Sequence, residues 1–163
     1  MRVLLSTIGS RGDFQPLLAL ALQLRELGHE VRLCAPPDFR GLAEEHGLPF
    51  VPVGPELRAP RPVQDLRKSV ADMVAGQFAT LREAAADCDV IVGCNQLQVA
   101  ARSAAELLGI RYVFTDYSPI TMPSPHHPPV PLPGQQTDPD ADNRTLWARE
   151  AQRRDATFGT ALN

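Results

Sequence analysis

A short loop near the N-terminus carries the residues best suited to chemistry. Gly9 and Gly12 have no side chain, so the backbone there can approach a ligand closely. Ser10 and Arg11 offer a hydroxyl and a guanidinium, which suit phosphate oxygens. Asp13 supplies a carboxylate, which can accept a proton or cap a helix. The residues alone leave both roles of Asp13 open.

The elements on either side of this loop place it at a helix N-terminus. Residues 1–7 form a short apolar run and are expected to be a buried strand. Leucines at helical spacing from Leu17 to Leu27 predict a helix, and Gly28 stands where a glycine commonly ends one. Free backbone N–H groups and the helix dipole at such a terminus favour an anion. We therefore expect residues 8–13 to face an anionic group.

The rest of the chain alternates between strand and helix patterns. Further strands are expected at residues 29–35, 49–53, 89–94 and 111–115. Helices are expected at residues 38–46, 63–86, 95–108 and 143–158. This alternation predicts an α/β fold with a doubly wound parallel sheet of strand order 3-2-1-4-5. Because that order reverses between strands 1 and 4, loops 8–13 and 93–96 should flank the ligand crevice.

Length, composition and charge exclude several classes of protein. The chain has 163 residues, 44% of them apolar, and a net charge of -3. This length suits one domain with one core, and nucleic-acid binding would need a clustered basic face. No apolar run is long enough to span a bilayer, so no stable membrane anchor is expected. Cys34, Cys88 and Cys94 lack close pairing and are expected to be buried free thiols in a reducing cytoplasm.

Residues 118–142 form a proline-rich loop. Eight of the 16 prolines lie between Pro119 and Pro139, a density that argues against a helix or a central strand. Such a loop is either a lid over a bound ligand or a mobile surface loop, and the sequence leaves both open. The adjacent His126 and His127 point apart and suit a metal poorly, so no metal site is expected.

Three blocks of sequence together resemble a known family. They are residues 9–16 (GSRGDFQP), 27–33 (LGHEVRL) and 47–54 (GLPFVPVG), with a weaker continuation to Ser118-Pro119. The pattern is similar to the N-terminal signature of the GT-B fold glycosyltransferases. It most resembles their natural-product branch, which includes glycopeptide-antibiotic enzymes, and the related sterol glucosyltransferases. The resemblance implies that residues 1–163 are one N-terminal, acceptor-binding domain, a fragment without its donor-binding C-terminal domain.

The resemblance also implies roles for individual residues. Asp13 matches the position of a general base, whereas without the family a helix cap would be favoured. Ser10, Arg11 and Gly12 are expected on the donor-phosphate side, with an exposed loop position as the alternative for Arg11. The expected acceptor contacts are Phe14, Met73, Phe78, Asn95, Gln96, Asp116 and Met122.

Several of these residues have a structural alternative. Asn95 and Gln96 line the acceptor site or cap the helix at 95–108. Met73 and Phe78 fit a core position with one edge on the pocket. Asp116 is interpreted as a turn or pocket residue, because a dyad with Asp13 would bring two carboxylates together.

The implied reaction joins two substrates. The donor is a nucleotide-sugar, linked to UDP or TDP, and the acceptor is a secondary-metabolite aglycone of antibiotic type. Neither a cofactor nor a metal ion is expected, and the isolated chain should be inactive. A sterol-type lipid glucosyltransferase and a non-enzymatic binding or accessory domain are the alternatives. A dinucleotide site is disfavoured, since the glycines are spaced Gly9-x-x-Gly12 and no acidic residue ends the second strand.

Overall fold

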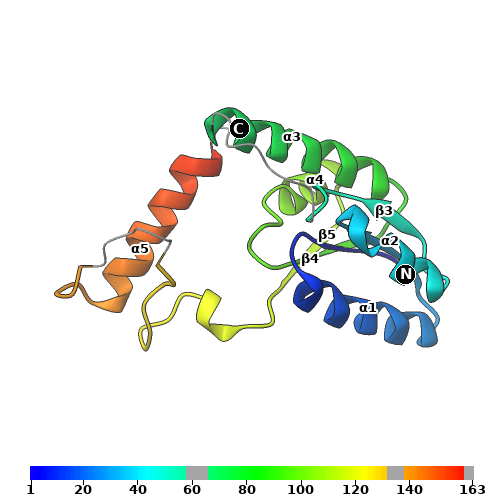
Figure 1. Cartoon of the computed structure of the whole chain (residues 1–163), viewed down its shortest axis with the longest axis horizontal. Coiled ribbons are helices and arrows are strands. Elements are labelled where there is room, and N and C mark those ends of the chain that lie inside the picture. The colour runs from blue at the N-terminus through cyan, green and yellow to red at the C-terminus, as the bar shows by residue number, and fades with distance from the viewer. Residues whose placement is uncertain (58–65, 132–137, 160–163) are drawn as a thin grey trace.

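Five parallel strands form one sheet, and their order sets the position of every loop. The computed structural model describes residues 1–57, 66–131 and 138–159 (Figure 1). The strands are β1 (Arg2–Thr7), β2 (Glu30–Ala35), β3 (Phe50–Pro52), β4 (Val90–Cys94) and β5 (Arg111–Thr115). They pair in the order β3-β2-β1-β4-β5, all parallel. The predicted α/β fold and strand order are confirmed.

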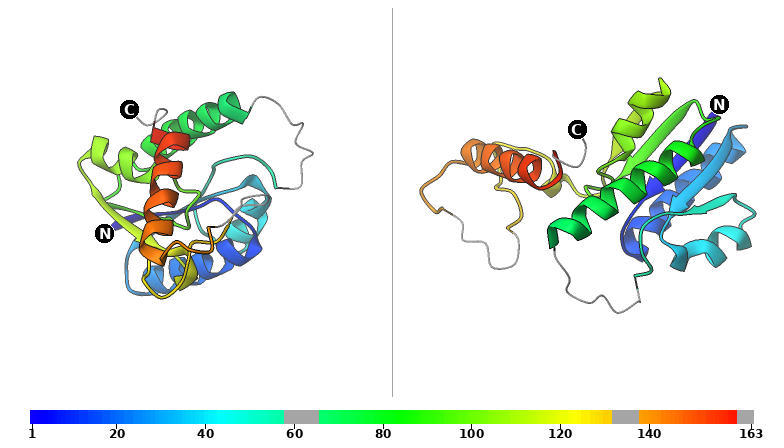
Figure 2. Two further views of the ribbon diagram at one scale, coloured as in Figure 1. Left: turned by 90° about the vertical axis from the view of Figure 1, so that its left-hand side faces the viewer. Right: turned by 90° about the horizontal axis from the view of Figure 1, so that it is seen from above.

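Helices cover both faces of the sheet (Figure 2). Leu5 of β1 belongs to the core shared with α1 (Arg11–Glu26) and α2 (Arg40–Glu45). Leu4 belongs to the core shared with α3 (Leu66–Ala84) and α4 (Ala101–Leu108). Successive strand residues point to opposite faces, so a strand between two helical layers is apolar throughout. This explains why the first strand could be predicted from consecutive apolar residues, Val3 to Leu5.

Two helices begin elsewhere than the sequence pattern predicts. α1 starts at Arg11, inside the predicted loop of residues 8–13, because Ser10 caps it and the glycine loop supplies its first turn. α4 starts at Ala101 rather than at Asn95. Asn95 has a φ of 66°, a left-handed conformation that an α-helix does not accept.

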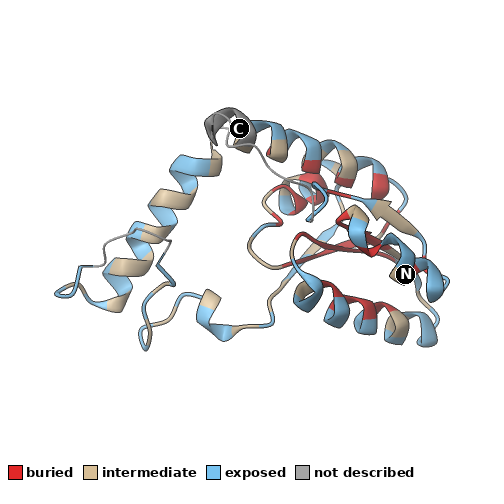
Figure 3. Cartoon of the chain, in the orientation of Figure 1, coloured by how far each residue is buried: buried red, intermediate tan, exposed pale blue. Residues whose placement is uncertain are grey.

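The C-terminal helix lies apart from the two helical layers. α5 spans Asn143–Arg154 and passes into a π-helical turn at Asp155–Gly159, which ends one residue beyond the predicted helical segment of residues 143–158. None of the residues of α5 is buried, whereas burial concentrates in the sheet and the inner faces of α1, α3 and α4 (Figure 3). In the described part of the chain, no helix has the length and apolar character needed to cross a bilayer.

The proline-rich loop is described on both sides of residues 132–137, which lie outside the described residues. It contains one short 3-10 turn, Pro119–Thr121, because proline is accepted at the first position of a helical turn. The side chain of Asn143 donates to the Pro125 carbonyl at 2.9 Å, and Trp147 Nε1 donates to the His127 carbonyl at 2.9 Å. The described part of the loop is therefore attached to α5, and a lid function stays a prediction.

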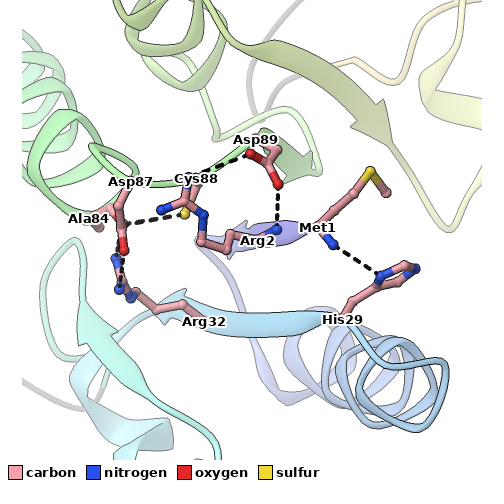
Figure 4. A network of polar contacts seen from close by, with 8 residues as sticks. All are labelled: Met1, Arg2, His29, Arg32, Ala84, Asp87, Cys88 and Asp89. Atoms are coloured by element: carbon pink, nitrogen blue, oxygen red, sulfur yellow. Dashed lines mark hydrogen bonds and ion pairs between the residues drawn. The ribbon is translucent and has the colours of Figure 1, made fainter.

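The edge of the sheet where the strands begin is held by charge pairs (Figure 4). The Arg2 backbone N–H donates to Asp89 Oδ2 at 2.7 Å, and Arg32 Nη1 pairs with Asp87 Oδ1 at 3.0 Å. These contacts join β1 and β2 to the turn before β4. The side-chain hydrogen bond from Arg32 lowers the pKa of Asp87, and the Arg2 backbone N–H does the same for the pKa of Asp89.

Candidate active site

Ser10 and Asp13 close the first turn of α1 together. Ser10 Oγ accepts the Gly12 backbone N–H at 3.2 Å, and Asp13 Oδ2 accepts the Ser10 backbone N–H at 2.7 Å. Ser10 Oγ also donates to Asp13 Oδ2 at 3.0 Å. This reciprocal arrangement is a capping box, in which Ser10 is the N-cap and Asp13 the third helical residue. The alternative in which Asp13 itself is the N-cap is therefore wrong.

Gly9 leaves the space that the Asp13 carboxylate occupies. A Cβ added at Gly9 would stand 2.4 Å from Asp13 Oδ2 and 3.1 Å from Asn95 Nδ2. Both distances are shorter than ordinary van der Waals contact. The backbone of Gly9 is not in the left-handed region. A glycine is needed here because a side chain would collide with the Asp13 carboxylate. The close approach that the sequence predicts for a ligand is made here by Asp13.

Asn95 joins the loop after β4 to the loop after β1. Its Nδ2 donates to the Ile8 carbonyl at 2.8 Å, to Thr7 Oγ1 at 3.1 Å and to Asp13 Oδ1 at 3.2 Å. Its Oδ1 accepts the Leu97 backbone N–H at 2.9 Å. The two loops predicted to flank the crevice are thus in contact. The helix-capping alternative for Asn95 is wrong, because its side chain is engaged in this junction and α4 has no side-chain cap.

A cavity of about 540 Å³ lies beside Asn95, between the end of β5, the start of α4 and α5. Its wall combines aromatic and aliphatic side chains with amides and a few charged groups, as is typical of small-molecule sites. The lining residues are Asn95, Gln96, Gln98, Val99, Arg102, Tyr112, Phe114, Thr121, Pro123, Trp147, Glu150, Ala151, Arg154, Asp155, Phe158 and Gly159. Asn95 is the link between this cavity and the Asp13 carboxylate.

Gln96 attaches both α5 and the proline-rich loop to the end of β4. Its Nε2 donates to the Thr121 carbonyl at 2.7 Å. Arg154 of α5 donates to the Gln96 side-chain oxygen and, at 3.1 Å, to the Gln96 backbone oxygen. Gln96 therefore lines the cavity and does not cap α4, and its amide joins α5 to the proline-rich loop. Its contact with an acceptor stays a prediction.

Asp116 organises the turn after β5. Its Oδ1 accepts the Ser118 backbone N–H at 3.2 Å, and its Oδ2 accepts the Thr121 hydroxyl at 2.7 Å. This is the turn role that the sequence left open. Tyr117, the next residue, is near both carboxylates: burial raises the pKa of its hydroxyl, and Cys94, Asp13 and Asp116 act in the same direction.

Comparison with known protein families shows which family this chain belongs to. Residues 3–116 match the model of the glycosyltransferase family 28 N-terminal domain. The chain belongs to this family. The match includes Asp13 in α1, and Asn95 and Asp116, which directly follow β4 and β5.

The relatives of this family 28 domain are named as glycosyltransferases. Vancomycin aglycone glucosyltransferase of Amycolatopsis orientalis is 43% identical over 171 residues, which are 100% of this chain and 42% of the relative. dTDP-epi-vancosaminyltransferase of the same organism is 40% identical over 170 residues, 100% of this chain and 39% of the relative. The solved structure of glycosyltransferase VinC in complex with dTDP is 25% identical with a TM-score of 0.54, over 72% of this chain and 35% of that one. The chain thus spans less than half of the curated relatives it matches.

Not every residue predicted for the acceptor site of this family 28 domain lies at the cavity. Phe14 is completely buried and stacks on Phe39 with ring centroids 4.5 Å apart, so its prediction as an acceptor contact is wrong. Met73 and Phe78 are half-buried on α3, and Phe78 packs against the core. Met122 is exposed. Acceptor contacts of these last three residues stay predictions.

The three residues predicted for the donor phosphate lie together at the start of α1. Ser10, Arg11 and Gly12 are all exposed there. The positive end of the helix dipole and the Arg11 guanidinium favour an anion at this position, although the capping box already uses the backbone N–H groups of Ser10 and Gly12. Their contact with the donor stays a prediction.

The sequence pattern does not reveal two buried glutamines that support the cavity. Gln77 of α3 donates to the Leu97 carbonyl at 3.1 Å and accepts the Ala100 backbone N–H at 3.4 Å. Gln98 accepts the Ser6 hydroxyl at 3.0 Å, while its Nε2 is buried without a partner in the described structure. Gln77 has a readable signal, a polar residue within an apolar helix face, whereas Gln98 lies in an irregular loop and gives none.

No group of three metal-binding side chains forms among the described residues. Of the two adjacent histidines, His127 lies edge-on against Trp147, with ring centroids 5.9 Å apart. The His127 ring of the proline-rich loop therefore packs against Trp147 of α5.

Proposed function

We propose that this chain is the acceptor-binding half of an inverting, nucleotide-sugar-dependent glycosyltransferase. The proposal depends on one observation: Ser10 and Asn95 hold the Asp13 carboxylate, and Asn95 itself lines a cavity of small-molecule size. Membership of the glycosyltransferase family 28 N-terminal domain supports it. A non-enzymatic accessory role is disfavoured, because a binding domain has no need of a positioned carboxylate next to its ligand cavity.

In the proposed reaction, the acceptor hydroxyl oxygen attacks the anomeric carbon of the sugar. The bond between that carbon and the diphosphate oxygen breaks, and its electron pair leaves with the nucleotide diphosphate. The hydroxyl proton passes to the Asp13 carboxylate. Sugar transfer has an oxocarbenium-like transition state, so the proton is lost late and a carboxylate is basic enough to accept it. One such displacement inverts the anomeric configuration.

The cavity supports a polycyclic, polar aglycone as the acceptor. Phe114 and Trp147 offer aromatic surface, while Glu150 and Arg154 place charges in the same wall. These charges favour a polar antibiotic-type aglycone over a sterol, which is the alternative acceptor. The relative that matches the whole chain at 43% identity is named for the vancomycin aglycone, which supports the same choice.

The donor is proposed to be a UDP- or TDP-sugar held mainly by a second domain. Ser10, Arg11 and Gly12 would meet its diphosphate from the start of α1, where the guanidinium and the helix N-terminus supply positive potential. The VinC complex with dTDP supports a thymidine nucleotide. We propose no metal ion and no cofactor. The chain alone should show neither turnover nor sub-micromolar affinity for these donors in calorimetry.

We place this reaction in a reducing cytoplasm. Cys34, Cys88 and Cys94 are all free and buried, as predicted. Burial raises the pKa of the Cys34 thiol to about 12, which keeps it in the unreactive thiol form.

Asp13→Asn tests the proposal in a protein that joins this chain to a donor-binding domain. The substituted amide can still accept the Ser10 N–H, so α1 keeps its cap, but it cannot accept a proton. With vancomycin aglycone and UDP- or TDP-glucose, kcat should fall by about 10²- to 10⁴-fold. Asp89→Asn is the matched control at the opposite edge of the sheet and should keep its kcat. Wild-type turnover by Asp13→Asn, or equal losses in both variants, would refute the base assignment.

A further inference from the structure

We infer that Asn95 is a positioning residue for the Asp13 carboxylate rather than a contact to the acceptor. The inference rests on the proposed function, in which Asp13 is the general base. Asn95 acts through Asp13, because one of its hydrogen bonds ends on the carboxylate, while the others tie it to the Thr7 hydroxyl, the Ile8 carbonyl and the Leu97 backbone N–H.

The backbone fixes which end of the Asn95 amide faces Asp13. Asn95 Oδ1 accepts the Leu97 backbone N–H at 2.9 Å, a contact that only the oxygen end of the amide can make. Nδ2 must then face the other way, where the Ile8 carbonyl lies at 2.8 Å and accepts from it. An N–H of this same nitrogen reaches Asp13 Oδ1 at 3.2 Å. A donor is therefore directed at the carboxylate by contacts that do not involve Asp13.

The Asn95 backbone is arranged to make this possible. Its φ of 66° belongs to the left-handed region, which asparagine tolerates better than most residues. Its backbone N–H donates to the Thr115 carbonyl at 3.0 Å, so the turn is anchored on β5. Among the described non-glycine residues, Asn95 alone has a positive φ. Unusual backbone of this kind is tolerated where a site requires it.

The two oxygens of Asp13 are held by different residues. Oδ2 accepts the backbone N–H and the hydroxyl of Ser10, at 2.7 and 3.0 Å. Oδ1 accepts from Asn95, which lines the cavity. Without Asn95, the carboxylate would be held at Oδ2 only and could rotate. Since a general base must lie within hydrogen-bond reach of the proton it accepts, such rotation would reduce the rate.

The test is a set of kinetic measurements on the chain joined to a donor-binding domain, with vancomycin aglycone and UDP- or TDP-glucose as probes. Asn95→Gly removes the amide and keeps a residue suited to φ of 66°. Its kcat should fall roughly tenfold to a hundredfold, the range expected for a lost hydrogen bond to a charged group, with KM for the aglycone nearly unchanged. In the Asp13→Asn background, the same substitution should change kcat less than about threefold, because residues that act as a unit are not additive.

Asn95→Asp separates positioning from space-filling. It keeps the shape of asparagine and the acceptor for Leu97 N–H, but places a second carboxylate against Asp13. A positioning role predicts a lower kcat for Asn95→Asp than for Asn95→Gly. A packing role predicts the reverse order.

A second measurement needs no turnover. In the ¹⁵N-labelled 163-residue chain, the side-chain amide signals of Asn95 should shift and exchange faster in Asp13→Ala. Three results would overturn the inference: an unchanged kcat in Asn95→Gly while Asp13→Asn is inactive, equal effects of Asn95→Gly in both backgrounds, or Asn95 amide signals indifferent to Asp13→Ala. An active Asp13→Asn would instead overturn the proposed function, and the amide signals would then decide the contact alone.

Discussion

Gly9→Ala should destabilise the chain through a collision with the Asp13 carboxylate. The new Cβ would lie 2.4 Å from Asp13 Oδ2, so the carboxylate must retreat by about 1 Å to reach ordinary contact. Its hydrogen bonds are now 2.7 Å and 3.0 Å to Ser10 and 3.2 Å to Asn95. A shift of that size takes most of them beyond hydrogen-bonding distance.

The expected cost follows from those bonds. Losing the capping box costs about 1 kcal/mol, and losing the half-buried bond to Asn95 costs about 1 kcal/mol more. Alanine restricts the unfolded chain and returns about 0.4–1 kcal/mol. The net loss of unfolding free energy is about 1–1.5 kcal/mol, or roughly 3–5 °C in Tm for a domain of this size.

Thermal unfolding of two matched variants checks this reasoning. Gly76→Ala, in α3 with nothing within 4 Å of the new Cβ, should instead stabilise by about 0.5–1 kcal/mol. In the Asp13→Ala background only the 3.1 Å approach to Asn95 Nδ2 is left, so Gly9→Ala should destabilise much less. A Gly9→Ala cost that is the same with and without the Asp13 carboxylate would refute the explanation.

Two further predictions concern other parts of the sheet. Gly93→Ala would place a Cβ 2.9 Å from the Tyr112 hydroxyl oxygen and 3.0 Å from its ring. Urea unfolding should therefore show a loss of about 1–3 kcal/mol in unfolding free energy. An unchanged urea midpoint would contradict the packing at this position. The hydrogen bond and charge of Arg32 lower the pKa of Asp87, so near this pKa the folded chain binds fewer protons than the unfolded chain. The stability that Asp87 contributes should be fully present above its ordinary pKa of 3.8 and be lost as the pH falls through its lower pKa in the folded chain. Asp87→Asn should reduce stability at about pH 6 and weaken its decline towards about pH 3, and urea titrations at both pH values with an identical decline in both proteins would argue against this contribution.

The strands and their order were predictable because one physical signal determines them. A strand covered on both faces is mostly apolar, and the apolar centre of β1 and the whole of β4 fulfil that condition. The position of Asp13 at the carboxyl end of β1 followed from the same signal. Its capping partner Ser10 was not assigned, since the apolar repeat of α1 begins only at Leu17, after the helix has started.

Phe14 and Asn95 show where sequence reasoning stops. Phe14 follows Asp13 directly, but each residue of a helix turns the side-chain direction by about 100°, so the neighbour of a site residue points into the core. Asn95 precedes an apolar helical repeat, which favours a cap, and its left-handed backbone leaves no mark in the sequence. The contact between Arg154 and Gln96 joins residues 58 positions apart, a separation at which no local pattern gives a signal.

The two edges of the sheet are fastened independently, and this affects how new specificities can arise. Ion pairs of Arg2 and Arg32 close the edge where strands begin, far along the strands from the loops that shape the cavity. Loop exchange between relatives can therefore change the acceptor pocket without disturbing strand register. The natural unit of such an exchange is larger than one loop, because Gln96 bonds both to Thr121 and to Arg154. A transplant that takes the β4 loop, the proline-rich loop and α5 together keeps these bonds, whereas one that moves a single loop breaks them.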